Sequence, residues 1–149
     1  MKKLFIMLAI SAVIASCGTS DKQTPSEPIT DAQKDQAARD TANYTTISWT
    51  DSTFLDLGKV KKGQIVEVSF PFTNAGDKNL FITNVTAGCG CTVPEKPQEA
   101  FPPGKGGVIK AQFDSNNQAV GEHRKQVFAS ANTKPNREHQ LTFRVEIIE

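Results

Sequence analysis

From Asn43 onward, apolar side chains recur at every second residue, and this period limits the possible fold more than any other feature of the chain. The clearest run, residues 64–74, places four large apolar side chains on one face: Val66, Val68, Phe70 and Phe72. Successive side chains of a β-strand point to opposite faces, so this run predicts a strand with one buried face. Pro71 lies on the opposite face and cannot donate to a ladder, which predicts an edge or a bulge at this position.

The same period elsewhere predicts about seven short strands, with turn residues between them. They are expected at residues 46–50, 53–57, 64–74, 80–85, 108–113, 123–131 and 141–147. No ten-residue segment after Asn43 has a helical period. Short alternating strands separated by turns are typical of an immunoglobulin-like β-sandwich, so we expect an all-β domain over residues 44–149.

Residues 1–16 have the layout of a secretory signal peptide, in which two lysines precede a short apolar run at residues 4–14. The run is shorter than the roughly 20 apolar residues that span a bilayer. Residues 14–17, Ile-Ala-Ser-Cys, match the bacterial lipobox, whose small residues let extended backbone enter a narrow protease site. We therefore expect cleavage before Cys17 and lipid attachment at this residue, rather than an uncleaved anchor with an incidental cysteine.

A lipid on Cys17 would place the protein in the cell envelope, held to a membrane. Each buried acyl CH₂ contributes about 0.8 kcal/mol, so several chains anchor a protein essentially permanently. The next residue is Gly18 and not aspartate, the usual inner-membrane retention signal of Gram-negative cells, which favours the outer membrane. Residues 17–43 are polar with almost no large apolar side chains, so we expect a lipidated flexible tether there, with no docked helix even at residues 31–40.

The charge balance of the expected domain argues against several function classes. Residues 44–149 contain 12 Lys and Arg against 11 Asp and Glu. This balance provides neither the basic surface that binds nucleic acid nor an acidic field for cationic substrates. No nucleophile, base and acid stand out as a set, so we expect neither catalysis nor a cofactor.

Four short motifs together resemble a known bacterial family. They are Phe-Leu-Asp-Leu-Gly-Lys-Val-Lys-Lys-Gly at 54–63, Phe-Pro-Phe-Thr-Asn-Ala-Gly at 70–76, Gly-Cys-Gly-Cys-Thr at 88–92, and Pro103-Gly104 with Phe113-Asp114. The chain from about Phe54 to its end resembles the family catalogued as domain of unknown function 1573, which is related to Hydin-like immunoglobulin folds and sperm-protein-like domains. The resemblance implies an immunoglobulin-like sandwich on an exported protein, and it implies no activity.

Cys89 and Cys91 are the two cysteines that remain once Cys17 carries a lipid, and an exported chain meets an oxidising setting. On an extended strand their Cα atoms would lie near the upper limit for a disulfide, about 7 Å. Gly90 can bend the backbone and shorten this distance. We expect either a local disulfide or a reduced pair close enough to form one. So small a ring would add only about 1.6 kcal/mol of stability before strain is subtracted.

Other interpretations of the cysteine pair remain open. Two thiolates on one face suit Cu(I) or Zn(II), with His123 or His139 as a third ligand, although the spacing is not that of a structural zinc site. A thiol-redox centre is less favoured, because no C-x-x-C motif begins a helix. The simplest interpretation is a glycine-rich turn with half-buried thiols, and exposed strand positions for both histidines. A disulfide or a plain turn is favoured over a metal.

These features together predict a membrane-anchored, non-catalytic interaction module that contacts another envelope protein or a polymer, and not nucleic acid. The alternative is an envelope protein that uses the Cys-Gly-Cys motif for thiol-redox chemistry or for binding copper or zinc.

Overall fold

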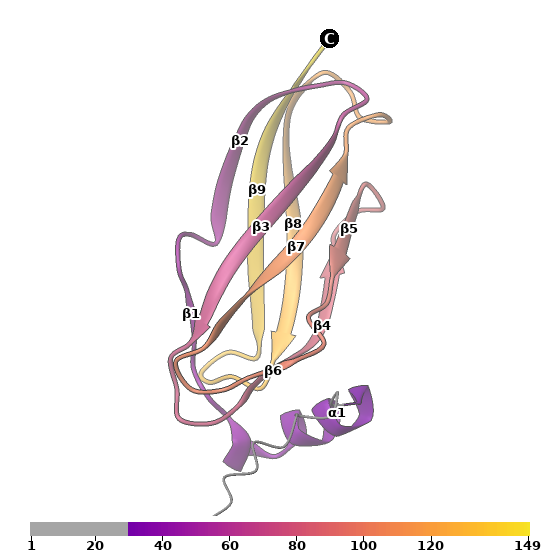
Figure 1. Cartoon of the computed structure of the whole chain (residues 1–149). Coiled ribbons are helices and arrows are strands. Elements are labelled where there is room, and N and C mark those ends of the chain that lie inside the picture. Colours follow the sequence, from indigo (N-terminus) through magenta and orange to yellow (C-terminus); the bar gives the residue numbers. More distant parts are fainter. Residues whose placement is uncertain (1–29) are drawn as a thin grey trace, which may run out of the picture.

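The alternating residues form two β-sheets that pack face to face in the computed structural model, which describes residues 30–149 (Figure 1). Their strands are β1 (Ile47–Trp49), β2 (Phe54–Lys61), β3 (Ile65–Asn74), β4 (Leu80–Ala87), β5 (Thr92–Glu95), β6 (Ala100–Phe101), β7 (Gly106–Asp114), β8 (Gly121–Ala131) and β9 (Glu138–Ile148). One sheet has the order β1-β3-β7-β5 and the other β2-β9-β8-β4-β6. The strand ladders are antiparallel except for the parallel pair β2–β9. The immunoglobulin-like sandwich expected from the sequence is confirmed.

Residues 30–149 contain nine strands rather than the seven expected from the alternation. The two additional strands are β5 and β6, which lie between Cys91 and the Pro-Gly loop at 102–104. β6 has two residues and β5 contains Pro94, so neither segment shows a readable alternation. Their pairing is set by the neighbours β7 and β4 and not by their own sequence.

The predicted inward positions form one core between the sheets. Phe70, Phe72 and Phe113 from one sheet and Phe143 from the other are almost fully buried. The rings of Phe113 and Phe143 meet edge to face with centroids 5.5 Å apart, which joins the two layers. A side chain at Gly107 would run into the rings of Phe72 and Phe101, so close ring packing requires glycine there.

Pro71 lies at the edge position that its missing N–H predicts. β1 pairs with β3 only at residues 72–74, and the Pro71 carbonyl accepts a hydrogen bond from the Thr50 N–H at 3.0 Å. The N–H and C=O of one strand residue point to the same side. The proline nitrogen therefore faces the point where β1 ends, where the ladder requires no N–H donor.

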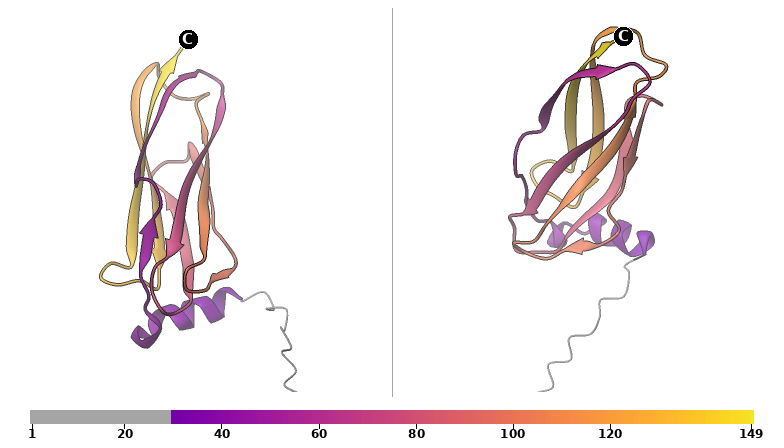
Figure 2. Two further views of the ribbon diagram at one scale, coloured as in Figure 1. Left: turned by 60° about the vertical axis from the view of Figure 1, so that its left-hand side comes forward. Right: turned by 45° about the horizontal axis from the view of Figure 1, so that its top comes forward.

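Helix α1 (Asp31–Arg39), followed by the short 3₁₀ helix η1 (Thr41–Asn43), lies across the end of the sandwich opposite the C-terminus (Figures 1 and 2). A capping box begins the helix: the Thr30 hydroxyl accepts from the Gln33 N–H, and the Gln33 side chain accepts from the Thr30 N–H. Lys34 and Ala38 are buried against the domain, with exposed fractions of 1% and 2%.

The expected undocked tether over residues 17–43 is therefore wrong for residues 30–43. The buried face of α1 consists of one small residue and the aliphatic stem of a lysine, so it leaves no apolar stripe in the sequence. Lys34 Nζ donates to the Gln98 side chain at 3.1 Å, and Lys96 Nζ donates to Asp31 at 2.6 Å. The expected signal peptide 1–16, Cys17 and the remainder of the tether lie outside the described residues.

Candidate functional site

The Gly-Cys-Gly-Cys motif forms the corner where the chain passes from one sheet to the other. The Gly88 N–H still bonds to the Gln126 carbonyl of β8 at 3.0 Å, which continues the β4–β8 ladder. The Cys91 carbonyl already accepts from the Asp114 N–H at 2.9 Å, which continues the β5–β7 ladder. Packed sheets lie about 10 Å apart, so the chain crosses this gap within the motif. Gly90 has open space around it, which suits a turn.

A disulfide joins Cys89 and Cys91 in the structure, with their Cα atoms 5.3 Å apart. This separation is shorter than the one expected for a flat strand, because the corner bends the backbone at Gly90. The buried Thr92 hydroxyl lies 3.6 Å from the Cys89 sulfur and 3.9 Å from the Cys91 sulfur, and its N–H bonds to the Cys89 carbonyl at 3.4 Å. Cys91 also packs against the hydrophobic core. The pair therefore fixes the geometry of a corner that joins both sheets.

The two histidines that the metal interpretation required make contacts elsewhere. His123 Nε2 lies 2.7 Å from the Ala119 carbonyl, and His139 Nε2 lies 2.8 Å from the Thr133 hydroxyl. His139 also packs edge to face on Trp49, and burial lowers the pKa of its imidazole. Both histidines are half-buried rather than exposed. No group of three or more His, Cys, Asp or Glu suited to a metal occurs among residues 30–149, so the geometry gives no support to the copper or zinc alternative.

A charged cluster lies on the outer face of the five-stranded sheet. Arg144 on β9 bonds to Asp56 on β2 and to Glu122 on β8, each at 2.8 Å. The Gly58 N–H and the Arg144 guanidinium lower the pKa of Asp56, and Arg144 lowers that of Glu122. Every charge in this trio has an opposite neighbour. The cluster therefore links three adjacent strands and does not present an unpaired group to a substrate.

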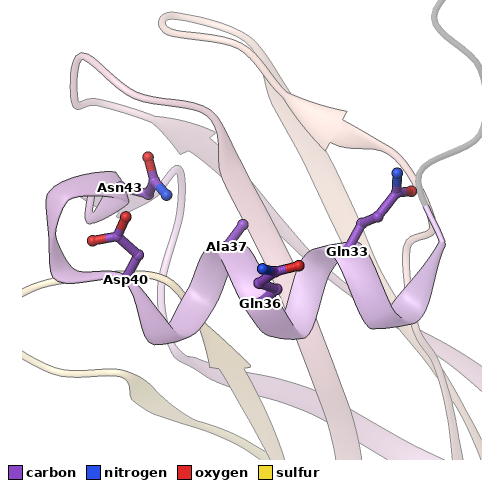
Figure 3. A pocket seen from close by; sticks show the side chains of 5 residues that line it. All are labelled: Gln33, Gln36, Ala37, Asp40 and Asn43. Carbon is purple, nitrogen blue, oxygen red and sulfur yellow. The ribbon is translucent and has the colours of Figure 1, made fainter.

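The surface hollow beside α1 is shallow and polar. Its volume is about 430 Å³, and its lining comes from α1, η1 and the residue between them: Gln33, Gln36, Ala37, Asp40 and Asn43. Figure 3 shows these side chains spread along the helix rather than converging on one point. Small-molecule sites are usually concave and largely apolar, with a few convergent polar groups. This hollow does not have that form.

Three features of the surface were not predicted from the sequence: the docked helix α1, its buried Lys34 and the charged trio around Arg144. The Thr30-x-x-Gln33 capping box was a readable signal for the helix. The trio depends on strand register, which brings Asp56 opposite Arg144 and Arg144 beside β8. Within residues 30–149, no helix is long and apolar enough to cross a membrane.

Comparison with solved structures supports the fold. A protein of unknown function from Porphyromonas gingivalis W83 has a TM-score of 0.62 and 15% identity, covering 72% of this chain and 49% of that one. The secreted serine protease VesC from Vibrio cholerae has a TM-score of 0.51 and 11% identity, covering 74% of this chain and 24% of that one. The chain thus spans about half of the first protein and about a quarter of the second. The likeness concerns the fold alone.

A further solved structure, the ASH/PapD-like domain of human CEP192, covers 97% of this chain and 99% of that one, with a TM-score of 0.45 and 11% identity. In sequence, none of the curated proteins matches the chain. A family model described as "Protein of unknown function (DUF1573)" matches residues 47–147, which cover all the strands of the sandwich except the last residue of β9.

Proposed function

The chain belongs to the DUF1573 family of proteins of unknown function, and from this premise we propose that the protein is a lipid-anchored, immunoglobulin-like interaction module of the cell envelope. Its sandwich contacts another envelope protein or an envelope polymer and carries out no reaction of its own. Cys17 carries the lipid, residues 18–29 form the tether, and the outer membrane is the address that Gly18 favours.

The docking of α1 at one end of the sandwich carries this proposal. The chain before Thr30 reaches the domain at the end covered by α1, because Lys34 and Ala38 are buried there and Asp31 and Lys34 are bonded to the loop at 96–98. Residues 18–29 can extend over at most about 40 Å. An anchor at Cys17 would therefore keep the α1 end within about 40 Å of the membrane surface. The sides of the sandwich and its far end then face other components of the envelope.

The alternative role in thiol-redox or soft-metal chemistry has less support. The disulfide occupies both sulfurs at a packed corner, and His123 and His139 bond to Ala119 and Thr133. An interaction module needs only an accessible, stable surface on a fixed scaffold, which the sandwich provides.

Affinity capture of the tagged lipoprotein from intact cells, after mild cross-linking, tests the proposal. We expect the same envelope component to be recovered in independent captures, and no copper or zinc at a one-to-one ratio in the purified protein. Captures without any recurrent component, together with tightly bound copper or zinc lost in a Cys89→Ser, Cys91→Ser variant, would contradict the proposal and favour the alternative.

A further inference from the structure

The sandwich protects most of its strand edges, which otherwise invite pairing with other chains. Along the outer edge of β2, three backbone N–H groups are capped by nearby side chains. Ser52 accepts from Phe54 at 3.0 Å, Asp56 accepts from Gly58 at 2.9 Å, and Gln64 accepts from Lys61 at 2.8 Å. A register shift between Asp56 and Lys59 further interrupts this edge. β2 is therefore a poor template for an added strand.

The edges of β5, β1 and β4 are partly covered in other ways. On β5, the Thr92 N–H is bonded to Cys89, and Pro94 has no N–H to offer. Beside β1, Thr45 exchanges backbone bonds with residues 132 and 134 of the other sheet's loop. β4 is paired with β6 at Leu80 and Phe81, and α1 and β5 both contact this strand.

The edge of β3 is different, because β1 covers only residues 72–74 of this ten-residue strand. Bonds at Gln64 and Asn74 show that even-numbered residues direct their backbone groups toward β7. The bond from Thr50 to Pro71 shows that odd-numbered residues direct theirs to the opposite side. Within residues 30–149, no backbone partner is found on that side for three residues: Ile65, Glu67 and Ser69.

An apolar seam accompanies this open edge. β2 and β3 are joined by a short turn and lie at the same side of the sandwich, each in a different sheet (Figure 2). Leu55 and Leu57 from β2 and Val66 from β3 pack on the core but are only partly buried. Ile65 at the end of the edge is 67% exposed. A strand added to β3 would cover apolar surface as well as satisfy backbone groups.

We propose that the open edge of β3 at Ile65–Ser69 binds an extended segment of another protein as an added β-strand. Main-chain bonds provide affinity in this mode, and alternate side chains provide specificity. The inward side chains of the segment are apolar and face the seam of Leu55, Leu57 and Val66. Its end nearest the β2–β3 turn is acidic, because Lys61 and Lys62 are exposed there. This inference rests on the proposed role as an interaction module and names the surface that the module uses.

Two other occupants fit less well. Antiparallel pairing of two copies about this edge places Glu67 opposite Glu67 of the second copy, and like charges directly opposite are destabilising. Residues 18–29 of the same chain contain Pro25 and Pro28, and Ile29 is their one large apolar residue. Neither the β3 edge of a second copy nor residues 18–29 combine free N–H groups, alternating apolar side chains and an acidic end.

A designed peptide tests the proposal on the full chain purified in detergent micelles. The probe is acetyl-Thr-Val-Thr-Val-Thr-Val-Asp-Asp, which pairs antiparallel to β3 with its acidic end near Lys62. We expect hydrogen exchange at the Glu67 and Ser69 amides to slow upon binding. A copy of the peptide with N-methylated central residues should bind at least about tenfold more weakly, because main-chain bonds supply most of the affinity.

The variant Glu67→Pro removes one open-edge N–H without touching the β7 ladder and should weaken binding to a similar degree, whereas Glu67→Gln should not. The N-methylated peptide keeps the test valid if Glu67→Pro does not fold. Absence of binding at about 1 mM peptide, equal binding of the methylated copy, or protection at β4 instead would overturn the proposal. A dimer in sedimentation that Glu67→Pro dissociates would assign the edge to a second copy. These outcomes would contradict the proposal for the β3 edge and not the proposed interaction module, because the capture experiment can still succeed through another surface.

Discussion

At the residue scale, Asn74 shows how a sequence motif translates into packing. It is the asparagine of the Phe-Pro-Phe-Thr-Asn-Ala-Gly run and is fully buried. Its amide donates to the carbonyls of Lys78 and Phe101, and its oxygen accepts from the Thr45 hydroxyl and the Gly76 N–H. One side chain therefore satisfies four polar groups near the α1 end, and two of these four bonds are buried. The motif is explained by structure, without a catalytic role for the asparagine.

The Cys89–Cys91 pair leads to a prediction about stability. Replacing both cysteines by serine should lower the free energy of unfolding by only about 0–2 kcal/mol, because the closed ring is very small. Denaturant unfolding of the variant and the wild type measures this difference. A much larger loss would show that burial of Cys91, or a structural metal, stabilises the corner instead. Intact mass without reductant, with and without alkylation, reports the redox state, and two freely alkylated thiols would exclude the bridge.

Arg144 leads to a prediction about pH. Asp56 and Glu122 have pKa values below their ordinary 3.8 and 4.5, Asp56 through the Gly58 N–H and Arg144, and Glu122 through Arg144. A carboxyl with a lowered folded-state pKa adds stability above its unfolded pKa and loses it as pH falls through the folded value. Unfolding should therefore become easier as pH falls below about 4, and this acid loss should be smaller in Arg144→Gln. Thermal unfolding between about pH 7 and 3 checks this, and identical acid profiles would contradict it.

At the element scale, the long strands could be predicted from sequence, whereas the docking of the helix and the short strands β5 and β6 could not. Alternation at Leu141, Phe143, Val145 and Ile147 places these side chains in the core as expected. β6 and β5 are too short or too interrupted to alternate, and they form because β4 and β7 offer open edges. α1 buries only Ala38 and the stem of Lys34, so its docking depends on the shape of the sandwich end and on partners such as Gln98.

The cysteine corner and the open edge of β3 could likewise be predicted from the sequence only in part. The sequence placed Cys89 and Cys91 together, because residues two apart share one face of a strand. It contained no information that His123 and His139 lie apart from them, or that the motif bridges two sheets. The open edge of β3 arises from where β1 leaves the ladder, after Trp49. Such long-range pairings are not encoded in any local pattern.

Docking of α1 is tested by a pair of matched alanines on the same helix. Ala38→Arg should release the helix, because Ala38 is 2% exposed and leaves no room for a long cation. Ala32→Arg should leave it docked, because Ala32 is exposed. Hydrogen exchange over residues 31–39 should rise sharply in the first variant alone, while exchange in the core strands changes little. Equal protection in both variants would show that α1 is not held by this face.

At the scale of the whole molecule, the proposed lipid anchor would depend on one atom, the sulfur of Cys17. Replacement of Cys17 by serine should abolish acyl labelling and move the protein from membrane to soluble fractions, because no lipid can then be attached. Fractionation of cells that express the variant and the wild type measures this directly. A variant that is processed and retained in the membrane as the wild type is would refute the lipobox interpretation.

We propose that the anchored sandwich presents its open side, and not its α1 end, to a partner. Site-specific photo-cross-linking in intact cells tests this most directly, with the reactive residue at Ser69 on the β3 edge or at the exposed Gln36 on α1. We expect one discrete protein adduct from Ser69 that disappears when Glu67→Pro is added, and no such adduct from Gln36. The same adduct from Gln36, or none from Ser69, would contradict it.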